Sequence, residues 1–225
     1  MKRTIFLAAG ALAAVGFAVL PFFVFFRAEL AYDLYFNQKI FYYHVPAAFM
    51  MFLSVFVCGF ASAKFLISRQ PRWDDVAAAA GDLVVLFGAL VLTSGPIWGK
   101  AAWGQYWVWD ARLTTSLLLW MIFVAYALLR RFGGPGSERL AAGLALFGTA
   151  DVPLVYFAVN FWKTQHPTNR VVPNLVGEMR TTFLIGAGAY LCFFLILLAA
   201  RIALGRSERR LAEVEDLAVE IGCLE

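Results

Sequence analysis

The sequence is poor in charge, in histidine and in paired cysteine. Aspartate, glutamate, lysine and arginine make up only 15% of the 225 residues, against roughly a quarter in an average soluble domain. The net charge of +4 and the lack of a basic stripe with interleaved aromatics argue against nucleic acid as a partner. The three cysteines form no Cys-x-x-Cys pair, so neither a thiol relay nor a zinc site is supported. Cys58 and Cys192 lie in apolar runs, where we interpret them as small hydrophobic residues.

Apolar residues, in contrast, make up 62% of the chain. A soluble fold of this length could not bury so much apolar surface, so the excess is expected to face lipid. A helix needs about 20 apolar residues to cross a bilayer. Six runs approach or exceed that length, at residues 5–26, 41–67, 76–97, 113–129, 140–162 and 183–204. The sequence therefore predicts an all-α integral membrane protein with six transmembrane helices.

The distribution of lysine and arginine predicts how these helices are oriented, because basic loops stay on the cytoplasmic side. With the N-terminus inside, 12 of the 19 basic residues fall on the inner side and 7 on the outer side, which predicts N-in and C-in. The first run follows Lys2 and Arg3, as in a signal peptide. It exceeds the roughly 7–15 residues of a signal h-region, however, so we interpret it as a retained helix. Residues 1–205 then form one transmembrane domain, and residues 206–225 form a cytoplasmic tail with a short surface helix.

The predicted topology collects the unusual residues on the outer side. The chain has two histidines: His44 at the outer end of the second helix, followed by Pro46, and His166 in the loop between the fifth and sixth helices. The aromatic loop between the third and fourth helices, residues 98–115, holds four of the seven tryptophans within twelve residues. In a helical turn, Trp103 and Trp107 would stack on one face. An interfacial aromatic belt would explain two or three of these rings, but a flat apolar platform for a planar ligand explains their density better.

These features together predict a haem site on the outer side. Two neutral imidazoles are suitable axial ligands for haem iron, and aromatic side chains supply contact for the porphyrin plane. The residues expected to bind haem are the two iron ligands His44 and His166, and the loop residues Trp98, Trp103, Tyr106, Trp107, Trp109, Asp110 and Arg112. Haem propionates pair with cations, and the sequence does not choose among Arg112, Lys163, Arg170 and Arg180.

The aromatic loop resembles the WWD signature of a superfamily of haem-handling membrane proteins, which includes the cytochrome c maturation proteins C and F and the cytochrome c synthesis protein A. The signature is carried by Gly95-Pro-Ile-Trp98 and by Trp103-Gly-Gln-Tyr-Trp107-Val-Trp109-Asp110-Ala-Arg112-Leu-Thr. The runs Phe41-Tyr-Tyr-His44-Val-Pro-Ala-Ala48 and Val159-Asn-Phe-Trp162-Lys-Thr-Gln-His166 are most similar to the C members, and the similarity covers roughly residues 20–200. Tyr106 stands where many relatives have tryptophan, although it is still a flat aromatic residue.

The resemblance implies a haem-delivery protein of the bacterial inner membrane rather than an enzyme, although a haem-lyase-like role in chaperone loading stays open. Such proteins hold b-type haem, non-covalently and transiently, at the periplasmic face between two outer histidines, which here are His44 and His166. They hand it to the periplasmic haem chaperone CcmE during c-type cytochrome maturation. They work with the ABC transporter subunits CcmA and CcmB and with the small membrane protein CcmD.

Two other functions stay open on the sequence alone. A b-type electron carrier also ligates haem through histidine, but usually between facing helices inside the bilayer. A channel or secondary transporter binds its substrate near the midplane at broken helices, and only Asp151 with Pro153 suggests such a site. Asp82 and Asp151 lie within apolar runs, where ionisable residues are costly and often functional. We interpret both as buried carboxyl groups that brace two helices or a partner subunit.

Overall fold

The chain forms a bundle of long α-helices in the computed structural model, which describes residues 3–30, 35–167 and 170–221. The helices are α1 (Arg3–Phe22), α2 (Phe41–Ser68), α3 (Pro71–Trp103), α4 (Ala111–Phe132), α5 (Ser137–Phe161) and α6 (Gly177–Glu220). α1 continues into a π-helical turn, Phe23–Arg27, and 3-10 helices precede α2 and α6 at Tyr35–Ile40 and Val172–Asn174. Across the described residues, six helices are long and apolar enough to span a membrane. The predicted all-α fold with six membrane-spanning helices is confirmed.

Short connections between consecutive helices make two tight helical hairpins. Arg69, in the left-handed conformation, ends α2, and Pro71 begins α3 two residues later. Proline suits that position because the first helical residue needs no N–H donor. The turn between α4 and α5 is built from Gly133 to Gly136, and Gly134 and Gly136 have positive φ angles that glycine adopts without steric cost. The α2–α3 and α4–α5 pairs are therefore antiparallel neighbours.

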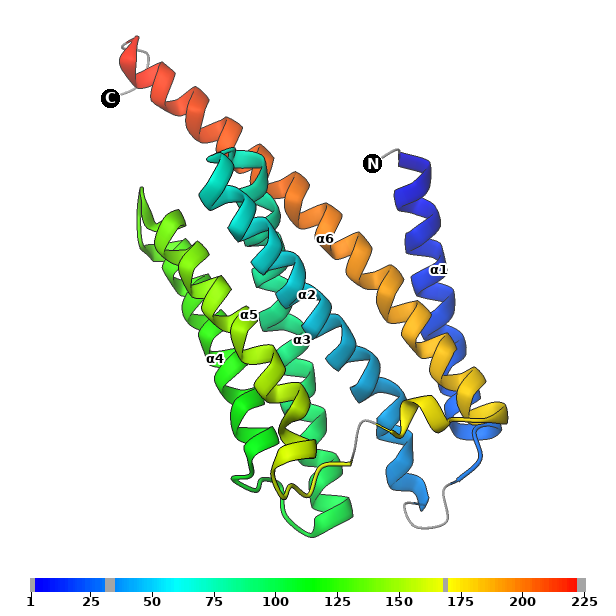
Figure 1. The fold of residues 1–225 in the computed structure, drawn as a ribbon. Coiled ribbons are helices and arrows are strands. Elements are labelled where there is room, and N and C mark those ends of the chain that lie inside the picture. Colours follow the sequence, from blue (N-terminus) through cyan, green and yellow to red (C-terminus); the bar gives the residue numbers. More distant parts are fainter. Residues whose placement is uncertain (1–2, 31–34, 168–169, 222–225) are drawn as a thin grey trace.

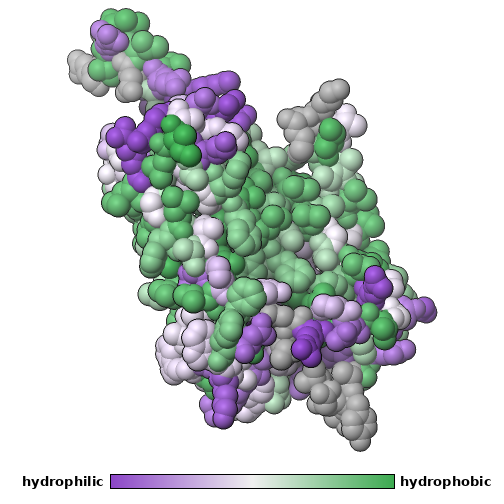
Figure 2. All heavy atoms as spheres, in the orientation of Figure 1, coloured by the Kyte–Doolittle hydropathy of each residue, from purple (hydrophilic) through white to green (hydrophobic). Residues whose placement is uncertain are grey.

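The α2–α3 hairpin forms the centre of the bundle (Figure 1). α2 packs against α3, α5 and α6, while α4 packs against α5 and α3, and α1 lies on the flank against α6. The core between these helices is apolar and contains Val55, Phe87 and Phe123, which are fully buried. Small residues let some helices approach closely: the Gly16 backbone of α1 lies against Ala189 of α6. On the face that Figure 2 shows, apolar residues form a broad band, and polar residues gather towards both ends.

The two ends of the bundle differ in chemistry, and we name them by their residues. The histidine end carries His44, His166 and the loop from residue 104 to residue 110. The arginine end carries the α2–α3 and α4–α5 turns and the C-terminal part of α6. The structure thus brings the two histidines and the aromatic loop to the same end of the molecule. The predicted N-in, C-in orientation stays a prediction.

Ion pairs at the arginine end tie α3 to its neighbours. Asp74 pairs with Arg130 of α4, with an Nη2–Oδ2 distance of 2.7 Å. The buried Asp75 pairs with Arg209 of α6, whose Nη1 lies 2.5 Å from Oδ1. Deeper along α3, Asp82 accepts from Arg201 Nε of α6 at 2.8 Å and so braces two helices as predicted. Its side chain is 37% exposed, however, so the prediction that it is buried was wrong. Asp151 of α5 is buried and its Oδ2 has no hydrogen-bond partner in the described part of the chain, so its bracing role stays a prediction.

Two helices run further than their apolar stretches predicted. α3 was expected to end near residue 97 but continues to Trp103, which adds the first part of the aromatic loop to the helix. α6 was expected to end near residue 204 but continues unbroken to Glu220, so the surface helix predicted in the tail is the end of α6 itself. At about 1.5 Å per residue, the 44 residues of α6 extend about 66 Å, roughly twice the hydrocarbon thickness of a bilayer.

Candidate functional site

His44 lies in the first part of α2 and its ring is held by α3. Its Nδ1 is 2.8 Å from Ser94 Oγ. Ser94 has one hydroxyl hydrogen, which it donates to the Leu90 carbonyl oxygen at 2.6 Å. We assign Ser94 as the acceptor from His44, because its hydroxyl is placed to donate to Leu90, and this assignment puts the imidazole proton on Nδ1. The Nε2 lone pair of His44 is then free, with no hydrogen-bond partner among the described residues.

Gly95 leaves room for this ring. A Cβ atom at Gly95 would lie 3.3 Å from His44 Cε1, which is a tight approach. The Ser94–Gly95 pair therefore both orients the imidazole and allows α3 to pass close to it.

His166 lies in the loop between α5 and α6 and reaches the same state by another route. Its Nδ1 is 2.8 Å from the Pro167 carbonyl oxygen, which only accepts, so Nδ1 carries the proton. Burial, together with the nearby Arg112 charge, lowers the pKa of His166 to about 4. The ring is therefore neutral at physiological pH, and its Nε2 lone pair has no hydrogen-bond partner in the described segments. His44 and His166 lie within electrostatic range of each other, and Arg112 lies within range of both.

Asp110 connects the aromatic loop to the loop that carries His166. It is the N-cap of α4, where its Oδ1 accepts from the Leu113 backbone N–H at 2.9 Å. Its Oδ2 accepts from the Gln165 backbone N–H at 3.1 Å. Gln165 immediately precedes His166 in the chain, so one carboxylate fixes both the start of α4 and the position of that histidine's backbone.

Arg112 joins the beginning of α4 to the end of α5. Its Nη1 donates to the Val155 carbonyl oxygen at 2.5 Å and to the Tyr156 carbonyl oxygen at 3.2 Å. A cation near the C-terminal end of α5 is favoured by the helix dipole. Of the four cations considered for propionates, Arg112 is the one whose charge acts on both histidines. Lys163, Arg170 and Arg180 are exposed.

The tryptophans form two separate pairs rather than one continuous stack. Trp98 and Trp103, at the end of α3, meet edge to face with ring centroids 5.0 Å apart. Trp107 and Trp109, in the loop, meet in the same way at 5.6 Å. The single helical face considered for Trp103 and Trp107 does not form, because Gly104 has a φ of +78° and ends α3 between them. Tyr106 is exposed, and its ring lies 5.5 Å from Lys100 Nζ.

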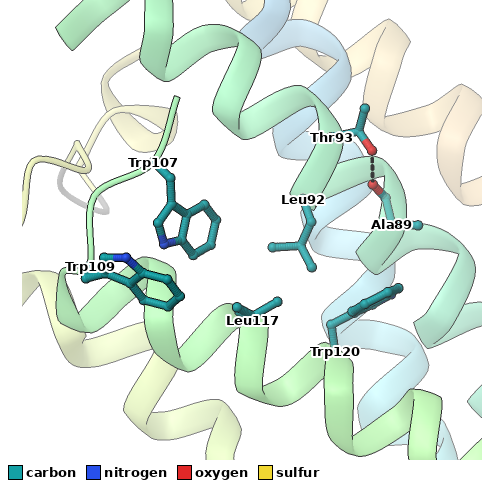
Figure 3. A pocket seen from close by; sticks show the side chains of 7 residues that line it. All are labelled: Ala89, Leu92, Thr93, Trp107, Trp109, Leu117 and Trp120. Carbon is teal, nitrogen blue, oxygen red and sulfur yellow. Dashed lines mark hydrogen bonds between the residues drawn. The ribbon is translucent and has the colours of Figure 1, made fainter. Parts of the chain in front are cut away.

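The Trp107–Trp109 pair stands at one end of an apolar groove between α3 and α4 (Figure 3). The groove has a volume of about 400 Å³ and is lined by Ala89, Leu92, Thr93, Trp107, Trp109, Leu117 and Trp120. Trp120 Nε1 is satisfied, since it donates to the Val85 carbonyl oxygen at 3.0 Å. Trp107 Nε1 is buried and donates to no acceptor in the described part of the chain.

The sequence did not identify the residues that position the histidines or line the groove. Ser94, Gly95 and Gln165 contact or position the histidines, and Leu92, Thr93, Leu117 and Trp120 line the groove. A single serine or glutamine in an apolar or loop segment is too common to single out. The one usable signal was Ser94-Gly95-Pro96, an unusual run for the interior of an apolar helix.

The fold and the site together define a multi-pass membrane protein that presents two unprotonated imidazole nitrogens beside a tryptophan-rich loop at one end of its bundle. A sequence model of the family described as "Heme exporter protein C" matches residues 1–216. The chain therefore belongs to the Heme exporter protein C family, and the resemblance to the C members of the haem-handling superfamily is confirmed.

Individual relatives agree with this family assignment. "Heme exporter protein C" of Escherichia coli K12 is 30% identical over 83% of this chain and 78% of its own length. "Heme exporter protein C" of Bradyrhizobium diazoefficiens is 38% identical over 65% of this chain and 57% of its own length. A "Putative cytochrome c biosynthesis ccmC-like mitochondrial protein" of Marchantia polymorpha is 34% identical over 60% of this chain. The match spans only 58% of the Marchantia protein.

Proposed function

We propose that this protein binds haem at its histidine end and delivers it to a partner protein for the maturation of c-type cytochromes. The observation that carries the proposal is the state of the two histidines. Each donates a hydrogen bond from Nδ1–H to a fixed acceptor, Ser94 Oγ or the Pro167 carbonyl oxygen, and each leaves Nε2 free. Hydrogen bonds from the ring nitrogen that does not bind the metal orient metal-binding imidazoles and fix their tautomer.

The surroundings also fit a haem cargo. The apolar groove beside Trp107 and Trp109 offers contact for a porphyrin edge. Arg112 supplies positive charge near both histidines, which favours the negatively charged propionates. Trp109 is 78% exposed, so a partner could approach the aromatic loop directly.

In this proposal each residue has a simple role and none breaks a covalent bond. His44 and His166 ligate the iron, which would be six-coordinate with two imidazole ligands. Asp110 and Arg112 hold the loops that carry the ligands. The haem is bound without covalent attachment and only transiently, so that it can be passed on. A b-type electron carrier is less well supported, because His166 lies in a loop at the end of the bundle rather than on a facing helix.

The family and the resemblance support a specific setting for this handover. We infer that the histidine end faces the periplasm, with the protein in the bacterial inner membrane. The acceptor is a periplasmic haem chaperone of the CcmE type. The working assembly includes an ABC transporter of CcmA and CcmB subunits and the small membrane protein CcmD. The name of the family supports a haem-export assembly.

The absorption spectrum of the purified protein tests the ligand assignment. In detergent with haem, we expect the spectrum of a six-coordinate, bis-histidine haem. His44→Ala and His166→Ala should each change it, and the double variant should lose it. Lys163→Ala, an exposed position in the same loop as His166, is the matched control and should leave the spectrum intact. An unaltered spectrum in the double variant would show that the iron is held elsewhere.

A further inference from the structure

A second groove lies between α4 and α5 at the opposite, arginine end of the bundle. Its volume is about 450 Å³, and it is lined by Leu129, Arg139, Leu140, Gly143, Leu144 and Phe147. Every lining residue except Arg139 is apolar. Leu140 and Phe147 are 67% and 61% exposed, so the groove opens on the apolar outer surface of the bundle and not on its core.

The groove follows one face of α5 from the helix start towards the middle of the bundle. Arg139 is the third residue of α5, and Phe147 lies eight residues further on. At about 1.5 Å per residue this is a length of about 12 Å, close to half the roughly 30 Å hydrocarbon thickness of a bilayer. Gly143 forms the middle of the floor, and a Cβ atom built there would meet no heavy atom within 4 Å. The groove therefore extends along α5 for nearly the thickness of one membrane leaflet, with room for an acyl chain along it.

Charge marks the end of the groove that lies at the membrane boundary. Arg139 is exposed and has no carboxylate partner in the described residues, unlike Arg130, which is neutralised by Asp74. Glu138 is next in sequence, but it is not part of the groove lining and it lies within electrostatic range of Asp74. An unpaired cation at the mouth of an apolar channel is complementary to a ligand with an anionic head and an apolar tail.

We propose that this groove is a binding site for an anionic phospholipid. The phosphate group binds the Arg139 guanidinium, and one acyl chain lies over Gly143 towards Phe147. Basic pockets between membrane helices bind anionic lipid head groups in this way. The site lies at the end of the bundle opposite to His44 and His166, so it stands or falls independently of the proposed haem site.

Native mass spectrometry of the full-length protein tests the proposal. The protein, in detergent, is mixed with equal amounts of phosphatidylglycerol and zwitterionic phosphatidylethanolamine, and the lipid retained on the protein ion is counted. We expect the wild type to retain phosphatidylglycerol at least fivefold over phosphatidylethanolamine. Arg139→Gln should abolish that preference, because it removes the phosphate partner. Gly143→Leu should lower retention of both lipids, because it fills the floor of the groove.

Two control variants make the outcome decisive. Arg210→Gln removes an exposed arginine of α6 outside the groove, and Gly10→Leu adds the same side chain to α1 at another glycine with nothing within 4 Å. Both should retain phosphatidylglycerol as the wild type does. Equal retention of the two lipids by the wild type, an unchanged preference in Arg139→Gln, or an equal loss in either control would each overturn the site.

Discussion

At the scale of single residues, Ser94 decides which nitrogen of His44 is available. Its hydroxyl oxygen accepts the hydrogen bond from His44 Nδ1–H because its own hydrogen is donated to the Leu90 carbonyl oxygen. Ser94→Ala removes that acceptor and leaves the ring free to rotate and to change tautomer. Loss of the hydrogen-bond acceptor that orients a metal-binding imidazole lowers metal affinity roughly 10- to 100-fold. We expect haem affinity, measured by titration of the absorption spectrum, to fall by that order.

Thr149 of α5 provides the control for Ser94. It also carries a helical hydroxyl that donates to a backbone carbonyl four residues back, at 2.8 Å from the Ala145 oxygen, and it is not part of the groove lining. Thr149→Ala should leave the axial ligation spectrum as in the wild type. If both variants lose haem equally, the effect belongs to the packing of the helices and not to the histidine's tautomer.

Asp110 allows its two hydrogen bonds to be separated. Asn at this position still caps α4, because Asn and Asp are equally good N-caps, but its amide NH₂ cannot accept from the Gln165 N–H. Asp110→Asn should therefore keep thermal stability and still weaken ligation by His166. The spectrum should shift towards five-coordinate haem and return to six-coordinate when imidazole is added.

Asp110→Ala removes both hydrogen bonds and completes the comparison. It should show the same spectral change and, in addition, lose about 1 kcal/mol of stability from the missing cap. A six-coordinate spectrum in Asp110→Asn without added imidazole would mean that the His166 loop is held by other contacts.

At the scale of helices and loops, the aromatic loop is a helix end followed by an irregular segment. Gly104 stops α3, and the chain then turns so that Trp107 and Trp109 close one end of the groove. Trp107→Ala and Trp109→Ala should each lower haem retention several-fold in a gel-filtration assay, while the protein still inserts into the membrane. Trp162→Ala, at a tryptophan of the same end that is 54% exposed and outside the groove, should retain haem. Unchanged retention in both loop variants would reduce the loop to an interfacial belt.

The helices themselves were predictable from hydropathy, but their ends were not. The six apolar runs correspond to α1 through α6, since burial in lipid and protein requires the same apolar side chains. Hydropathy fails to predict the helix from Trp98 to Trp103, where glycine, lysine and tryptophan lower the mean hydropathy although the backbone stays helical as far as Trp103. It fails again past Leu204, where charged residues continue α6 beyond the apolar segment.

The site was partly predictable for a related reason. Histidine is rare here and tryptophan is concentrated in one loop, so both stand out in the sequence, and the structure brings the two histidines and that loop to one end. Their partners are ordinary residues such as Ser94 and Gln165, and only the packing of α2 on α3 and of one loop on another gives them a role. The pairing of the tryptophans could not be read from spacing, because it depends on the φ of Gly104.

At the scale of the whole molecule, the orientation in the membrane can be tested directly. In a background where Cys223 is serine, Lys163→Cys at the histidine end and Arg210→Cys at the arginine end are both exposed positions. A membrane-impermeant maleimide added to spheroplasts should label the first and not the second, and membrane disruption should expose the second. Labelling of Arg210→Cys in intact spheroplasts would contradict N-in, C-in and place the haem site on the wrong side for delivery to the periplasm.

The two proposed iron ligands come from distant parts of the chain, His44 from the start of α2 and His166 from the loop after α5. When synthesis has reached only the α2–α3 hairpin, the chain contains His44 but not yet His166. With the roles proposed above, haem capture must wait until five of the six helices have been synthesised and inserted. A chain truncated before this loop would then be unable to sequester the cofactor, and haem occupancy would itself report that synthesis has passed α5.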